Sequence, residues 1–119
     1  MYYLKKASKM SNKITVECFE HYDDVDGASY FAGTILVESK TFKREFLMPY
    51  QRAKGIGYQT EAKRILNQAN VLDAKHGCTL GKFCRDNDID YSANIEMDCT
   101  LEEVRQVSKD YNKRLDKNR

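Results

Sequence analysis

The stretch RAKGIGYQTEAKR, residues 52–64, combines cationic side chains with two glycines where a helix is expected to begin. Unpaired backbone N–H groups at a helix start carry partial positive charge, and glycines let an anion approach the main chain closely. Tyrosines beside such a loop can stack on the bases of a single strand. This chemistry predicts a nucleic-acid or anion site, for which the candidate residues are Lys43, Arg44, Arg52, Lys54, Gly55, Gly57, Tyr58, Lys63 and Arg64.

The same stretch also fits a simpler interpretation. The phosphate-binding pattern G-x-x-x-x-G-K-[ST] is absent, and the segment 55–57, GIG, is shorter than the dinucleotide-binding pattern G-x-G-x-x-G. A connection from a strand to a helix, with lysines that stay in water, would have this composition too. The sequence leaves both interpretations open.

A second charged run, residues 86–103, holds seven acidic residues and no basic one. Glu102 and Glu103 fall in the expected first turn of a helix, where anions are stabilised. The other carboxylates could bind a basic partner surface in the place of nucleic-acid phosphates, and these candidates are Asp86, Asp88, Asp90, Glu96 and Asp98. A solvated connection between elements is the alternative.

Two further groups of residues have metal-binding side chains but unsuitable spacing. In the acidic stretch 20–26, Tyr22 stands where a calcium loop needs its first ligand, and Gly33 stands where it needs a bidentate glutamate. The intervals between His76, Cys78, Cys84 and Cys99 differ from the paired ligands of zinc sites. We therefore expect no metal, no cofactor and no catalytic residue, and we expect four reduced cysteines.

Alternation of apolar and polar residues predicts three strands, over 13–22, 28–39 and 41–49. The pair Asp26-Gly27 suits the turn of the first hairpin, and Pro49 is expected to end the third strand. The second strand is apolar on both faces, which predicts a central position in the sheet. A short fourth strand could lie near Ile89 or Ile95.

Helical spacing of apolar residues predicts a helix over 59–76, which Gly77 would close. A short helix that Thr79 caps should follow, with Leu80, Phe83 and Cys84 turned inward. The last helix should begin with a capping box, in which Thr100 and Glu103 bond to each other's backbone N–H groups.

These elements predict an α+β fold in which a three-stranded antiparallel meander packs against a long helix, a short helix and a C-terminal helix. Residues 1–12 are expected to form a basic extension, and residues 13–119 a single domain. No run approaches the roughly 18 apolar residues that span a bilayer, and no secretory signal is visible. We therefore expect a soluble, cytoplasmic protein.

Over residues 13–76, this order of elements resembles the beginning of ribonuclease H-like domains. Such enzymes hold two divalent metals between carboxylates of the first strand, the first helix and a later strand end. The resemblance implies Glu17 or Glu20, Glu61, and Asp86 or Asp88 as metal ligands. Because the aspartate expected inside the first strand is missing, the resemblance implies an inactive relative rather than an active nuclease.

The function that the sequence favours is that of a small non-enzymatic regulator or inhibitor. It would contact nucleic acid, or a nucleic-acid-handling protein complex, through residues 40–64, which contain seven basic residues and only two acidic ones. One alternative is a protein–protein interaction module that uses the acidic run or the C-terminal helix, whose apolar seam could also form a homodimer. A metal-dependent nuclease is the alternative among enzymes.

Overall fold

The computed structural model describes residues 12–53 and 57–117. Lys54 and Gly55 of the predicted basic site, and residues 1–11 of the predicted extension, lie outside the described residues. In chain order, the elements are β1 (Lys13–Asp23), β2 (Ala28–Glu38), β3 (Lys43–Arg52), α1 (Tyr58–Gln68), α2 (Leu80–Asp86), β4 (Asp90–Glu96) and α3 (Leu101–Lys117).

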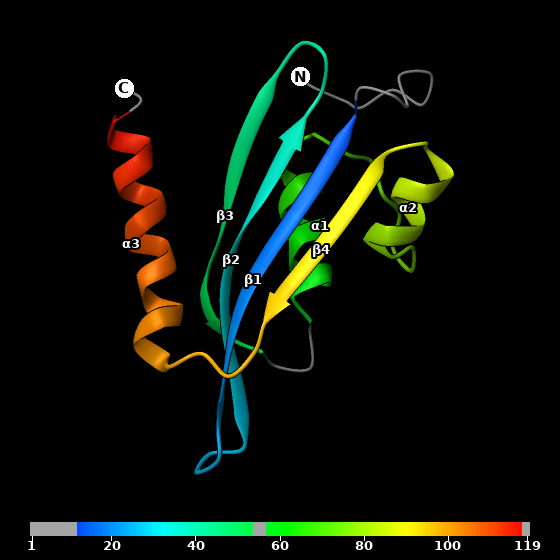
Figure 1. Cartoon of the computed structure of the whole chain (residues 1–119). Coiled ribbons are helices and arrows are strands. Elements are labelled where there is room, and N and C mark those ends of the chain that lie inside the picture. The colour runs from blue at the N-terminus through cyan, green and yellow to red at the C-terminus, as the bar shows by residue number, and fades with distance from the viewer. Residues whose placement is uncertain (1–11, 54–56, 118–119) are drawn as a thin grey trace.

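The four strands form one sheet in the order β3-β2-β1-β4 (Figure 1). β1, β2 and β3 form the antiparallel meander that the sequence predicts, and β4 is the predicted short fourth strand. β4 runs parallel to β1, as the long connection through α1 and α2 allows. The predicted α+β fold is therefore confirmed.

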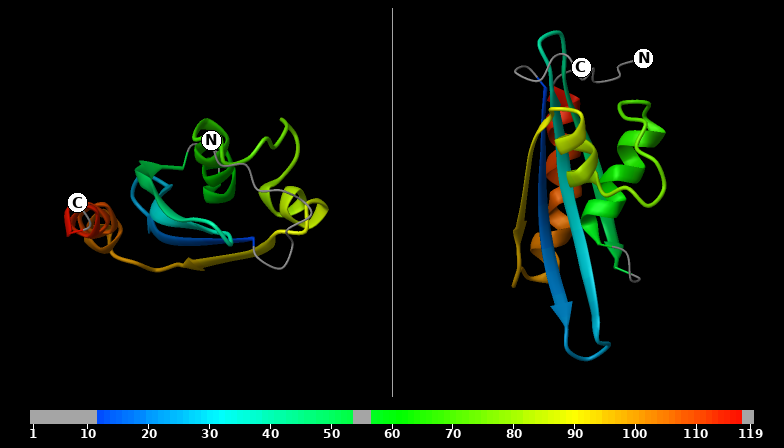
Figure 2. Two further views of the ribbon diagram at one scale, coloured as in Figure 1. Left: turned by 90° about the horizontal axis from the view of Figure 1, so that it is seen from above. Right: turned by 90° about the vertical axis from the view of Figure 1, so that its right-hand side faces the viewer.

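Helices cover both faces of this sheet, with α1 and α2 on one face and α3 on the other (Figure 2). Because strand side chains alternate, Ile14, Val16 and Cys18 of β1 all enter the main core under α1 and α2. A smaller cluster under α3 contains Ala32, Cys99 and Val104. The face under α3 is the more polar one, and it carries the candidate site described below.

β2 lies inside the sheet, as its apolar pattern predicts. Phe31 and Ala32 are successive residues, so they point to opposite faces, and both are buried. Phe31 packs in the main core and Ala32 in the cluster under α3.

The prediction that Pro49 ends the third strand is wrong. β3 continues to Arg52, but its register with β2 shifts between Phe31 and Gly33. Proline has no N–H for a ladder hydrogen bond, and an irregularity on an edge strand accommodates that loss.

The prediction of a helix over 59–76 is also wrong at its end. α1 stops at Gln68, and Asn70 has a positive φ of 61°, which breaks the helical path. The Asn67 side chain then bonds to both the backbone N–H and the carbonyl of Ala74, which fixes the following loop. Val71 and Leu72 are still buried, so the apolar spacing reflects core packing without a helix.

The predicted caps of the two later helices are confirmed. The Thr79 hydroxyl accepts the Lys82 N–H at 3.1 Å. Thr100 and Glu103 form the reciprocal capping box, with distances of 3.1 Å to the Thr100 hydroxyl and 2.9 Å to the Glu103 carboxylate. None of the helices described is long and apolar enough to cross a membrane.

Candidate functional site

The structure spreads the predicted basic residues over distant places. Lys43 and Arg44 begin β3 and Arg52 ends it, so roughly 30 Å of strand separates them at about 3.3 Å per residue. Arg44 lies over the ring of Phe46, with its guanidinium carbon 4.6 Å from the ring centroid. One compact ligand could not bind both ends of this strand.

The basic residues of α1 have partners within the chain. The Arg64 guanidinium bonds to the Glu61 carboxylate, which raises the pKa of Arg64, and it also bonds to Gln68 at 3.0 Å. The Lys63 ammonium donates to the Lys75 carbonyl at 2.6 Å. These contacts leave less cationic surface at the start of α1 than the sequence predicts.

The glycine and tyrosine of the predicted site are placed at the beginning of α1. Gly57 is the N-cap residue, with extended backbone and no side-chain cap. Tyr58 is half-buried and packs against the main core. Part of the Tyr58 ring is therefore buried and not available to stack on a base.

The predicted acidic residues divide between the two ends of β4. Asp86 ends α2 and pairs with Lys82, whose ammonium lies 2.7 Å away. Asp88 and Asp98 occupy turns and have positive φ values of 56° and 64°. Asp90 and Glu96 are the first and last residues of β4.

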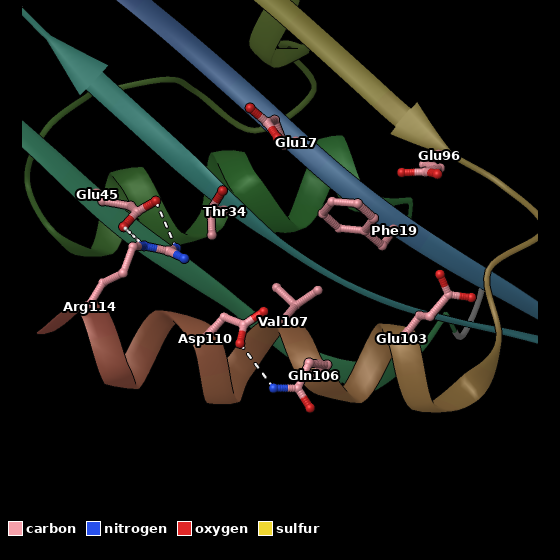
Figure 3. Close-up of a pocket in the computed structure, with 10 residues that line it drawn as sticks. All are labelled: Glu17, Phe19, Thr34, Glu45, Glu96, Glu103, Gln106, Val107, Asp110 and Arg114. Atoms are coloured by element: carbon pink, nitrogen blue, oxygen red, sulfur yellow. Dashed lines mark hydrogen bonds and ion pairs between the residues drawn. The ribbon is translucent and has the colours of Figure 1, made fainter.

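A groove of about 550 Å³ lies between α3 and the sheet face that α3 partly covers (Figure 3). We call it the acidic groove. Its lining residues are Glu17, Phe19, Thr34, Glu45, Glu96, Glu103, Gln106, Val107, Asp110 and Arg114. Of the predicted acidic residues, Glu96 alone lines it.

The acidic groove is lined by side chains that recur with the period of a strand on β1 and with the period of a helix on α3. On β1, Glu17 and Phe19 are two residues apart and so share the face toward α3, opposite the core residue Cys18. On α3, the lining side chains recur at intervals of three and four residues, which places them on one stripe of the helix. Figure 3 shows Phe19 and Val107 between the carboxylates of the strands and those of the helix.

The acidic groove carries five carboxylates and one guanidinium, a formal charge of −4. The one cation, Arg114, is already bonded to Glu45, with an N–O distance of 3.1 Å. Asp110 accepts a hydrogen bond from Gln106 at 3.0 Å. The backbone N–H of Thr100 donates to Glu103 and holds the pKa of this carboxyl below its usual range.

Glu17 and Glu96 differ from the other carboxylates of the groove. Within residues 12–53 and 57–117, no hydrogen bond or ion pair reaches either carboxylate. A cation from outside can therefore approach these two carboxylates without displacing a described protein group.

The carboxylates that the ribonuclease H-like resemblance implies do not converge. Glu17 faces α3, whereas Glu61 is buried on α1 across the sheet, where Gln51 and Arg64 bond to it. Over the whole described part of the chain, no group of three or more His, Cys, Asp or Glu side chains could hold a metal ion. The carboxylates that the resemblance implies therefore do not form a shared metal site among the described residues.

The acidic stretch 20–26 has a structural role in the first hairpin. The Asp23 carboxylate accepts the Val25 and Asp26 N–H groups, and the Asp26 carboxylate accepts the Ala28 N–H and the Tyr30 hydroxyl, so both shape the hairpin turn. All four cysteines are free, and Cys18, Cys84 and Cys99 are buried.

Sequence reasoning missed most of the acidic groove, namely Glu17 as an outward-facing side chain together with Glu45, Asp110 and Arg114. A signal was present on the last helix, where polar residues at positions 103, 106, 110 and 114 run beside the apolar residues Val104 and Val107. Which sheet face this stripe would meet depends on the packing of α3. The sequence does not contain that information locally.

Comparisons with protein-family models, with curated proteins and with solved structures gave no match. The acidic groove and the distribution of charge around it are therefore the observations on which a function can rest.

Proposed function

We propose that this chain is a non-enzymatic binding protein whose acidic groove holds a basic segment of a partner protein. One observation carries the proposal: five carboxylates line a single groove whose one cation is already bonded to Glu45. This excess of negative charge attracts basic partners, speeds their association and disfavours acidic partners.

The residues that line the groove also suit lysine and arginine side chains, which would carry the positive charge. Lysine and arginine have long apolar stems below their charged ends. Phe19 and Val107 offer apolar surface to these stems, and Glu17 and Glu96 offer free carboxylates to the charged ends. A basic peptide segment can satisfy both, whereas a small inorganic cation would use the carboxylates alone.

The partner class that this chemistry fits best is a nucleic-acid-handling protein. Such proteins carry exposed lysines and arginines that bind phosphates. The carboxylates of the acidic groove would take the place of phosphates and so occupy the surface that nucleic acid needs. Binding of this kind gives the chain the role of a regulator or inhibitor.

Direct binding of nucleic acid through residues 40–64 is the second candidate, and one observation favours it. The rings of Tyr30 and Tyr50 stack with centroids 5.8 Å apart, and the Arg105 guanidinium lies 5.3 Å from the centroid of Tyr50. Arg52 is the register partner of Tyr30 on the neighbouring strand. Aromatic rings beside guanidinium groups suit single-stranded bases, but Lys43 and Arg44 lie at the far end of β3.

The test uses a capped peptide of about nine residues, long enough to extend along the groove, in which lysine alternates with threonine and valine. We expect the peptide to bind with a salt-dependent Kd, measured by fluorescence anisotropy, and a glutamate-for-lysine peptide not to bind. Glu17→Gln combined with Glu96→Gln should weaken binding at least about fivefold, since exposed ion pairs contribute up to about 1 kcal/mol each.

Glu102→Gln is the control, because Glu102 is an exposed glutamate of α3 that does not line the groove. It should change the Kd less than about twofold. Equal losses in both variants, or no binding of the lysine peptide, would refute the proposal. Binding of a single-stranded oligonucleotide that Arg52→Glu abolishes would instead favour the second candidate.

A further inference from the structure

The binding mode of the partner can be inferred from the edges of the sheet, if the proposed function is correct. We infer that the basic segment binds as an extended strand that pairs with the outer edge of β4 and thereby enlarges the sheet. Addition of a strand in this way uses main-chain hydrogen bonds for affinity and alternate side chains for specificity.

The two edges of the sheet differ in how well they are protected. β3 has cationic residues at its start, a register irregularity, and Pro49, all of which discourage further pairing. The ion pair between Arg114 and Glu45 also holds α3 against β3. β4 has no proline and no lysine, and its register with β1 is unbroken over all seven residues.

The hydrogen-bonding groups of β4 alternate between its two edges. The Asp90 N–H donates to the Asn12 carbonyl at 3.0 Å, so Asp90 faces the β1 side of the strand. By alternation Ser92 and Asn94 also face β1, and the backbone groups of Tyr91, Ala93 and Ile95 point outward. Among the described residues, no strand pairs with that outward side.

Charge determines which kind of strand fits this edge. Asp90 and Glu96 lie at the two ends of β4, and no basic residue occurs between positions 86 and 104. Ser92 and Asn94 share the face of Glu96, which lines the acidic groove. A partner strand with lysine or arginine at alternate positions would therefore place these side chains on the sheet face that carries the groove, with one of them beside Glu96.

The intervening side chains of such a strand would meet apolar surface on the opposite face. Ile95 is 37% exposed, although it shares its face with the core residues Tyr91 and Ala93. Met97, the next residue but one, is 60% exposed. A strand that alternates basic with apolar residues complements both faces of β4.

A second copy of the chain fits this edge less well. Antiparallel pairing of two β4 strands about Ala93 would place Asp90 of one copy opposite Glu96 of the other. Like charges directly opposite each other destabilise a strand pair. A basic strand replaces this repulsion by attraction, which is why we assign the edge to a partner.

The experiment follows amide hydrogen exchange by NMR, with and without a saturating amount of the lysine peptide. We expect the amides of Ala93 and Ile95 to exchange at least about tenfold more slowly in the complex, because they gain partners. The amides of Ser92 and Asn94, which already bond to β1, should change little. Slower exchange that is confined to the amides of Ala93 and Ile95 would be specific to pairing at the outer edge of β4.

A variant gives a second, independent readout. Ala93→Pro removes one outward N–H at a position where an edge strand tolerates proline, and it should weaken peptide binding at least about fivefold. Ala93→Ser keeps that N–H and serves as the control. Thermal unfolding of both variants shows whether the fold is retained.

The outcomes separate this inference from the proposed function. If the peptide binds and Glu17 and Glu96 matter, but the amides of Ala93 and Ile95 exchange as before, pairing at β4 is refuted and the proposed function stands. If the peptide does not bind, both fail. Amides that are already protected without peptide would mean that the chain itself or a second copy fills the edge, which also overturns the inference.

Discussion

Arg114 near the end of α3 and Glu45 in β3 form a two-pronged ion pair, although 69 residues separate them in the chain. The guanidinium nitrogens Nη2 and Nε lie 3.1 and 3.3 Å from the two carboxylate oxygens. One turn earlier, the Tyr111 hydroxyl donates to the Glu45 carbonyl at 3.2 Å. A single residue of β3 thus fixes the C-terminal half of α3 and closes one end of the acidic groove.

We predict that Glu45→Gln lowers the free energy of unfolding by about 0.5 kcal/mol only. The side chains of Arg114 and Glu45 are 48% and 34% exposed, and ion pairs in contact with water contribute little. The difference from the wild type should shrink at high ionic strength, because salt screens the pair. Urea unfolding at low and high salt measures both effects, and a salt-independent loss above about 2 kcal/mol would contradict this account.

Gly33 allows β1 and β2 to approach each other, and Gly33→Ala should destabilise the fold by more than about 3 kcal/mol. A Cβ at this position would overlap the Glu17 carbonyl oxygen and lie 2.8 Å from Cε of Met48 and 3.0 Å from Cα of Cys18. Two of these three atoms belong to the backbone, which cannot move aside without breaking the sheet.

Gly81→Ala is the matched control for this prediction. Gly81 lies in α2, and the nearest atom to an added Cβ is 3.7 Å away, on the ring of Tyr91. Because alanine favours a helix over glycine by about 0.5–1 kcal/mol, this variant should be slightly more stable. Similar unfolding midpoints for the two variants would show that the space around Gly33 does not constrain the sheet.

Local signals in the sequence account for much of the fold. The Asp26-Gly27 turn, the Thr79 cap and the capping box of Thr100 with Glu103 each depend on residues at most three positions apart. Such signals act within one element, so they survive in any tertiary arrangement. The end of α1 involves bonds between Asn67 and Ala74, and the path of β3 past Pro49 depends on its pairing with β2. These interactions join residues further apart, and there the predictions failed.

The candidate site was harder to predict for the same reason. Arg52 and Arg64 are 12 residues apart in the sequence, but they lie on opposite faces of the sheet. Glu17 and Glu103 are far apart in the sequence, and they line one groove because α3 crosses that face. A charge count along the chain detects charged runs, but it does not say which runs meet.

The buried carboxylate of Glu61 should make stability depend on pH in the acidic range. The Arg64 guanidinium, and then the Gln51 amide, hold the pKa of Glu61 below its usual value of 4.5. Because the folded-state pKa is lowered, this group stabilises the fold above the unfolded-state value, and the contribution disappears as the pH falls through the folded-state value.

We therefore predict that Glu61→Gln costs about 1–2 kcal/mol at neutral pH and progressively less below about pH 4.5. Urea unfolding of the wild type and the variant over a pH series measures this difference. Glu102→Gln is again a suitable control, because Glu102 is exposed and takes part in none of the ion pairs among residues 12–53 and 57–117. A gap between wild type and Glu61→Gln that stays constant with pH would contradict the assigned role of the carboxylate.

The four thiols should differ sharply in reactivity. Burial raises the pKa of Cys18 and of Cys84 to about 12, and Cys99 is also buried with a raised pKa. Cys78 is half-buried, so a reagent can reach it. Because the thiolate is the reacting form, we predict that Cys78 reacts with a disulfide reagent at least about 100-fold faster than the other three in the folded protein.

The absorbance of the released thiol gives the rates, and Cys78→Ser should remove the fast phase while denaturant exposes the remaining three thiols. A fast phase that persists in Cys78→Ser would show that one of the buried cysteines opens to solvent in the native state.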